Sequence, residues 1–157
     1  MFQKHFQMRS ILTFLFAFVI VSKTTVGQQV DIAWRTLENI DFSKKYVEEI
    51  KGYMLFPKFP MELKKLHGKI VRVTGFTIPV DESGKRLALS AYPYAACFFC
   101  GKAGPASVLT VKLKNANTGY RVDQWKTFEG KLVLNETDIH EFYYILDDAK
   151  EVKTKEK

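Results

Sequence analysis

Two cysteines are the residues of this chain whose type and spacing are most suited to chemistry. Cys97 and Cys100 stand two residues apart in the segment AACFFCGKAGP and are the only cysteines in the sequence. Thiols this close can form a disulfide, a redox couple or half of a metal site. In an exported chain, neighbouring thiols meet oxidising conditions and tend to pair. A bridge across so short a loop adds little entropic stabilisation, so it would mainly shape the turn.

The residues around the cysteines bear on the redox and metal alternatives. A reactive thiolate needs a helix N-terminus or a nearby cation, but a Gly-rich segment with a proline follows Cys100, and Lys102 is the nearby cation. A Cys-x-x-Cys pair is half of a zinc knuckle, and His67 and His140 are the candidates for further ligands. A two-thiolate site open to a partner would suit transfer of zinc or copper. Disulfide, metal site and redox couple all stay open.

Aromatic residues flank the cysteines and the neighbouring turns. Aromatic side chains that are exposed together mark a ligand or protein site, whereas ordinary packing would bury them. The predicted ligand or partner surface consists of Tyr92, Tyr94, Phe98, Phe99 and Trp125. The sequence has no Gly-rich phosphate loop, nucleophile elbow or HExxH motif. It therefore predicts a non-catalytic protein without catalytic residues.

Residues 1–27 have the pattern of a secretory signal peptide. Lys4 and Arg9 make a basic start, the apolar run Ile11–Val21 follows, and small and polar residues end the segment. A membrane-spanning helix needs about 20 apolar residues, more than this run contains, so no stable membrane span is expected after cleavage. We therefore expect an exported protein, either periplasmic or secreted.

The charge of the chain does not indicate a nucleic-acid partner. The formal net charge is +7, but part of it belongs to the predicted signal peptide, and the remaining lysines are spread along the chain. A nucleic-acid-binding protein usually gathers its basic residues on one face. The expected partners are instead an envelope protein or a small ligand.

Residues 28–67 are predicted to be a helical or irregular N-terminal segment that packs on the rest of the chain. Apolar residues recur there at a helical period, as at Trp34, Leu37 and Ile40. A second helical piece is expected around Tyr46–Ile50, with its apolar residues packing inward.

From Gly68 onward the apolar period changes to two, which predicts strands. The expected strands are residues 69–80, 86–92, 107–114, 127–135 and 142–152. Gly75 interrupts the first strand, as it must if that strand curls from one half of a small barrel to the other. The predicted fold is mainly β with an N-terminal helical segment. Residues 68–152 form a small five-stranded OB-like antiparallel barrel, and residues 153–157 form a disordered tail.

Several stretches carry a resemblance to a known family. Trp34-x-x-Leu37, FPKFPMELKKLHGKIVRVTGFTIPV, a cysteine-bearing loop and SVLTVKL follow one another in the sequence. This pattern resembles a bacterial family of exported domains of unknown function with an OB-like core, most strongly over Trp34–Leu113. The resemblance implies export to the periplasm and a small barrel, and it brings no established activity.

The predicted function is that of an exported binding or accessory module with its Cys-x-x-Cys loop at one end of the barrel. Two alternatives use the same loop. The first is a periplasmic protein that handles zinc or copper through Cys97 and Cys100, and the second is a thiol-redox protein.

Overall fold

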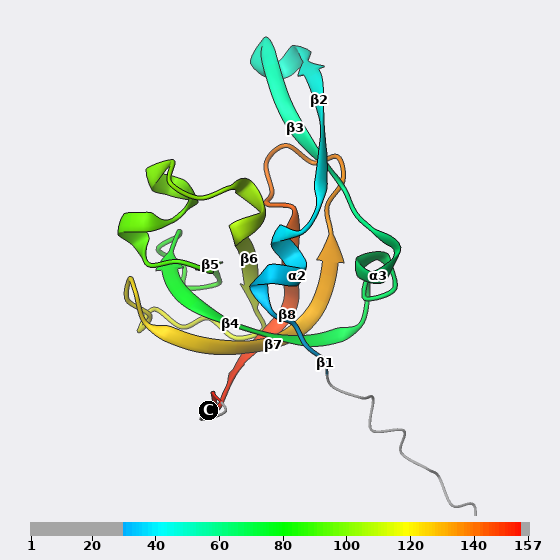
Figure 1. Ribbon diagram of the computed structural model, residues 1–157. Coiled ribbons are helices and arrows are strands. Elements are labelled where there is room, and N and C mark those ends of the chain that lie inside the picture. The colour runs from blue at the N-terminus through cyan, green and yellow to red at the C-terminus, as the bar shows by residue number, and fades with distance from the viewer. Residues whose placement is uncertain (1–29, 155–157) are drawn as a thin grey trace, which may run out of the picture.

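The structure is a computed structural model that describes residues 30–154. The predicted signal peptide and residues 155–157 of the predicted tail lie outside the described residues. Within residues 30–154, five strands close into a barrel (Figure 1): β4 (Ile70–Pro79), β5 (Arg86–Ser90), β6 (Val108–Leu113), β7 (Trp125–Leu134) and β8 (Tyr144–Val152). Their order is β4-β5-β6-β8-β7, and pairing between β4 and β7 closes the sheet. The predicted small, mainly-β barrel is confirmed.

One strand pair differs from the antiparallel arrangement that we expected. β6 and β8 run parallel, with Thr110 opposite Ile145 and Val111 opposite Leu146. The other barrel pairs are antiparallel. Because β7 runs antiparallel to both β4 and β8, β8 must run in the same direction as β4 and therefore as β6. The two-residue period of apolar side chains shows which face of a strand is buried. It carries no information on the direction in which the strand runs.

The two-residue period of the strands builds the core of the barrel. Leu87 and Leu89 of β5 point inward with Leu109 and Val111 of β6, and all four are buried. Tyr144 is the largest fully buried side chain, and its hydroxyl donates a hydrogen bond of 2.7 Å to the carbonyl oxygen of Leu37. This bond satisfies both buried polar groups and ties the N-terminal segment to the barrel.

The described part of the N-terminal segment, residues 30–67, contains two short α-helices. α2 (Trp34–Glu38) and α3 (Met61–Lys64) each bury one leucine, Leu37 and Leu63, in the core. β1 (Val30–Asp31) adds to the sheet parallel to β4. The helical period that we recognised at Trp34 and Leu37 is therefore present in α2.

Residues 41–58 form a β-hairpin, so the helical piece expected around Tyr46–Ile50 is reduced to the short 3-10 helix Glu48–Ile50, and its expected inward packing is wrong. β2 (Asp41–Val47) pairs antiparallel with β3 (Gly52–Lys58), and a 3-10 turn (Glu48–Ile50) connects them. Tyr46 lies directly opposite Tyr53, with ring centroids 5.4 Å apart, and both side chains are exposed. Cross-strand aromatic pairs stabilise a hairpin, and this one replaces the inward packing that we expected.

The hairpin projects from the barrel and rests on the loop between β7 and β8 (Figure 1). The hydroxyl of Tyr143 donates a hydrogen bond of 2.6 Å to the carbonyl oxygen of Leu55, and the Tyr143 ring packs on Phe42. At the tip of the hairpin, a carboxylate oxygen of Glu49 lies 2.9 Å from Nε2 of His140, which belongs to the loop between β7 and β8. Within residues 30–154, no helix is long and apolar enough to cross a membrane.

Candidate functional site

The candidate site lies on the outer face of the barrel wall formed by β5 and β6. Since Leu87 and Leu89 face the core, the alternating residues Arg86 and Ala88 of β5 face outward. Ala88 forms a second apolar cluster with Ile78, Val108 and the buried Cys97. The cysteine-bearing loop therefore packs against the side of the barrel, and not at its end as we predicted.

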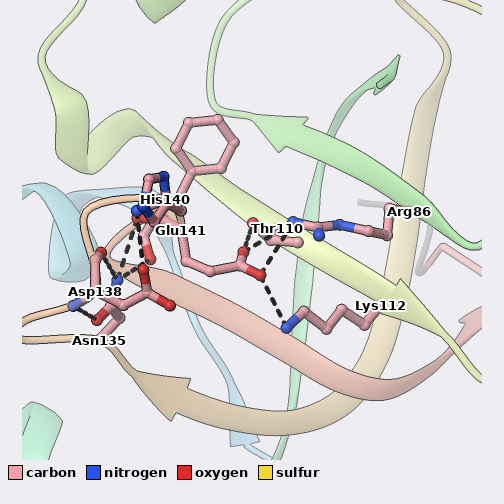
Figure 2. Close-up of polar contacts among 8 residues, drawn as sticks. Arg86, Thr110, Lys112, Asn135, Asp138, His140 and Glu141 are labelled. Atoms are coloured by element: carbon pink, nitrogen blue, oxygen red, sulfur yellow. Dashed lines mark hydrogen bonds and ion pairs between the residues drawn. The ribbon is translucent and has the colours of Figure 1, made fainter. Parts of the chain in front are cut away.

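The register of β5 and β6 places two cations directly opposite each other on this outer face. Arg86 pairs with Lys112, and like charges in such positions repel. Glu141, from the loop before β8, bridges them (Figure 2). Arg86 Nη2 donates to both carboxylate oxygens at 3.0 Å, and Lys112 Nζ lies 2.9 Å from Oε1. The Thr110 hydroxyl also donates to Glu141, at 3.1 Å. These bonds hold Glu141, and thus the neighbouring Phe142, against the barrel wall.

Asn135 shapes the loop that carries Glu141 (Figure 2). Its side-chain nitrogen donates to the carbonyl oxygens of Asp138, Glu141 and Phe142, at 2.7, 3.1 and 3.2 Å. Its side-chain oxygen accepts the backbone N–H groups of Thr137 and Asp138. The Asn135 side chain thus gives the backbone groups of this loop the hydrogen bonds that a helix or strand would otherwise provide. The loop is thus held in one shape without a helix.

Cys97 and Cys100 share one hydrogen-bond acceptor. The two thiols donate to the carbonyl oxygen of Tyr94 at 3.0 and 2.9 Å, so both sulfurs lie on the same side of the turn. Both cysteines are free thiols in the structure, with Cys97 buried and Cys100 exposed.

The two histidines are engaged elsewhere. His67 Nδ1 accepts the backbone N–H of Leu134 at 3.2 Å, and His140 contacts Glu49. In the part of the chain that the structure describes, no three His, Cys, Asp or Glu side chains are grouped so as to hold a metal ion. The predicted ligand set of two cysteines and a histidine is therefore not assembled in this conformation.

The predicted aromatic surface divides into two parts. Phe98 and Phe99 pack with Phe142, with ring centroids 5.8 to 6.3 Å apart. The other three predicted residues are exposed outside this cluster. Trp125 packs on Phe76 at 4.7 Å. A hydrogen bond to the carboxylate of Glu38, together with the negative charge of that carboxylate, raises the pKa of the Tyr92 hydroxyl above its ordinary value. The backbone N–H of Tyr94 donates to Asp123.

The three phenylalanines border a cleft of about 580 Å³, which we call the aromatic cleft. The hairpin, the cysteine-bearing loop and the loop before β8 all contribute to it. Its apolar lining includes Met54, Val80, Phe98, Phe99, Ile139 and Phe142, and its polar lining includes Asp81, Arg86, Thr110, His140 and Glu141. Sequence reasoning missed Phe142, Arg86 and Glu141. The outward position of Arg86 follows from strand alternation, but its pairing with Lys112 depends on register between strands.

Comparisons with known proteins concern the fold. No protein-family model matches the sequence, and no curated protein matches it significantly. The structure is similar to the crystal structure of a DUF3299 family protein from Pseudomonas aeruginosa PAO1. The TM-score is 0.51 and the sequence identity 13%, and the match covers 83% of this chain and 100% of that chain. At this identity the similarity shows a shared fold, and the protein that shares it belongs to a family of uncharacterised domains.

Proposed function

We propose that this protein is an exported, non-catalytic binding module that takes a small ligand into the aromatic cleft. The observation that supports this most is the grouping of three phenylalanine rings around a cleft whose wall is held by the Glu141 network. Small-molecule sites are usually clefts of about 300 to 1,000 Å³ with an apolar lining and few polar groups. The neighbouring depression around His67 and Lys64 is lined mainly by polar side chains and fits this description less well.

Two further parts of the proposal rest on sequence and fold. Export to the periplasm rests on the signal-peptide pattern of residues 1–27. An OB-like core and membership in a family of exported domains of unknown function rest on the resemblance over Trp34–Leu113. They are supported by the fold shared with the DUF3299 family protein.

The neutral fluorescent probe N-phenyl-1-naphthylamine tests whether the aromatic cleft binds ligands. We expect saturable binding to the mature protein, and an affinity about tenfold lower in Phe99→Ser, because the variant loses apolar contact area with the probe. Tyr94→Ser is the matched control. Tyr94 is in the same loop and is 45% exposed, against 44% for Phe99, but it does not line the cleft. Absence of saturable binding, or equal losses in the two variants, would refute the proposal.

A second candidate function uses the cysteine pair to handle zinc or copper. It is supported by the two thiols that contact one carbonyl oxygen and thus face the same way. In this function the reduced protein binds copper(I) or zinc through the thiolates of Cys97 and Cys100.

Metal analysis of the reduced protein tests this second function. We expect one metal ion per chain in the natural sequence, and a loss of at least about tenfold in affinity in Cys100→Ser, since one of two thiolate ligands is removed. Cys100 is exposed, so this variant is expected to fold. Equal metal binding by the variant would exclude the thiolate site. A fall from two free thiols to none on mild oxidation would instead favour the disulfide.

A further inference from the structure

The cysteine-bearing loop holds two thiols that a short movement can join. The thiols of Cys97 and Cys100 both donate hydrogen bonds to the carbonyl oxygen of Tyr94, at 3.0 and 2.9 Å. Because both sulfur atoms contact one oxygen atom, the distance between them cannot exceed the sum of these two distances. A disulfide needs its sulfur atoms about 2 Å apart, so forming the bond takes a movement of at most about 4 Å.

The two cysteines differ in how freely they can move. Cys97 is fully buried in the second apolar cluster, against the barrel wall. Cys100 is exposed, and the backbone that follows it lies in open space. A Cβ atom built at Gly101 or Gly104 would meet no atom of the described residues within 4 Å, apart from its neighbours in the chain. When a bond draws the two sulfur atoms together, Cys100 is therefore the residue that moves.

The two residues between the cysteines are part of the aromatic cleft. Phe98 and Phe99 lie in the 3-10 turn Phe98–Cys100, and both line the cleft. Phe98 follows the buried Cys97 and packs on the second apolar cluster, which holds its ring in place. Phe99 precedes Cys100, and its exposed ring packs on Phe142 with the ring centroids 5.8 Å apart. A movement of Cys100 therefore displaces Phe99 more than Phe98.

We propose that a disulfide between Cys97 and Cys100 weakens ligand binding in the aromatic cleft. The bond draws Cys100 toward the buried Cys97 and moves the Phe99 ring out of its position beside Phe142. The dithiol form then binds the ligand and the disulfide form releases it. The proposal rests on the proposed function, because it describes the regulation of the same cleft.

Thiol–disulfide exchange with a disulfide such as oxidised glutathione forms the bond. The thiolate of the exposed Cys100 attacks one glutathione sulfur and expels the other glutathione as a thiolate, which leaves a mixed disulfide. The Cys97 thiolate then attacks the Cys100 sulfur and expels the second glutathione. The protein gives up two electrons and two protons, and these convert one glutathione disulfide into two thiols.

Titration of both forms with N-phenyl-1-naphthylamine tests the proposal. The mature protein is treated with dithiothreitol or with oxidised glutathione in metal-free buffer, and its free thiols are counted. Oxidation should lower the count from two to none. We expect the disulfide form to bind the dye about fivefold more weakly, because part of the apolar contact with Phe99 is lost. Dithiothreitol should then restore the affinity.

Three variants locate the effect in the loop. Cys100→Ser cannot form the bond, so it should keep the affinity of the dithiol form after the same oxidation. Phe99→Ser has already lost the ring, so its lower affinity should be the same in both forms. Tyr94→Ser is the matched control. It should keep the full redox dependence, because its backbone carbonyl remains and its side chain does not line the cleft.

The outcomes separate the regulation from the existence of the site. Equal dye affinity in the two forms, or thiols that oxidised glutathione does not join, would overturn the redox control and leave the ligand cleft standing. Absence of dye binding to the dithiol form would overturn the proposed function as well. A redox effect that persists in Phe99→Ser would contradict the role of that ring.

Nuclear Overhauser contacts on the unmodified protein give a check that depends on no variant. Contacts between the ring protons of Phe99 and Phe142 should be present in the dithiol form, in which the two rings pack together. They should weaken or vanish in the disulfide form. Contacts of equal strength in both forms would overturn the proposed movement of Phe99.

Discussion

Replacing Gly75 by alanine is expected to destabilise the barrel by about 3 kcal/mol, since a methyl group would be forced into a closed space. A Cβ atom at this position would lie 2.5 Å from the carbonyl oxygen of Ser90 and 3.2 Å from the Trp34 ring. The Ser90 backbone cannot withdraw, because β5 is paired with β4 on one side and β6 on the other. The free energy of unfolding, measured by urea titration, checks this expectation.

Gly104→Ala is the control for the Gly75 prediction. No atom lies within 4 Å of a Cβ built at Gly104, and its φ of −72° suits alanine. The free energy of unfolding of Gly104→Ala should therefore stay within about 0.5 kcal/mol of that of the natural protein. If Gly75→Ala were as stable as Gly104→Ala, the close approach of β4 to Ser90 would be wrong.

Replacing Glu129 by glutamine is expected to cost about 2 kcal/mol at pH 7, because a nearly buried carboxylate loses two charged hydrogen bonds. Its side chain is 7% exposed, and it lies 2.8 Å from Arg72 Nε and 3.0 Å from Lys150 Nζ. The strand register places both cations directly opposite Glu129, one on each neighbouring strand. Urea titration of the two proteins at a series of pH values measures the difference.

The same prediction has a pH dependence with a definite sign. Burial by itself would raise the pKa of Glu129, but hydrogen bonds and charges from Lys150 and Arg72 outweigh it and hold the pKa below its ordinary value of 4.5. A lowered pKa in the folded state means that the carboxylate stabilises the fold above 4.5, and that this stabilisation is lost as the pH falls through the lowered value. The stability difference between the natural protein and Glu129→Gln should therefore shrink in acid.

Glu151→Gln provides the comparison for Glu129→Gln. Glu151 lies on β8 and pairs with Lys126 at 2.8 Å, but its side chain is 36% exposed. An ion pair in contact with solvent contributes about 0 to 1 kcal/mol, so this variant should lose less stability. A loss from Glu151→Gln as large as that from Glu129→Gln would mean that burial does not set the strength of these pairs.

The strands of the barrel could be predicted because their signal is local. Alternating apolar residues predicted strands at 107–114 and 127–135, and the structure has them at Val108–Leu113 and Trp125–Leu134. The interruption at Gly75 was also informative. β4 pairs with β7 as far as Phe76 and with β5 from Phe76 onward, so the strand does pass from one half of the barrel to the other beside this glycine.

The hairpin could not be predicted from the same kind of pattern. Tyr46 and Ile50 are four residues apart, which matches a helix, but both are half exposed in the structure. What stabilises β2 is its partner strand and the contact with Tyr143, a residue far away in the sequence. A period read within one segment cannot detect a partner outside it.

The candidate site was predicted only in part for a related reason. Cys97, Phe98 and Phe99 were recognised because they are close in sequence to one another. Phe98 and Phe99 line the aromatic cleft together with Asp81 and Phe142, which come from other segments of the chain that the fold brings next to them. The structure also places Trp125 beside Phe76, away from the phenylalanine cluster that we expected it to join.

The amino-acid sequence by itself determined the positions of the barrel strands, the side chains that fill the core, and the close spacing of the two thiols. Each of these depends on the alternation or adjacency of residues within one stretch of chain. The tertiary structure alone decided the parallel pairing of β6 with β8, the Arg86–Glu141–Lys112 bridge, and the aromatic cleft. These features require contacts between distant segments, whose register is set only when the barrel closes and all its strands bury their apolar faces together.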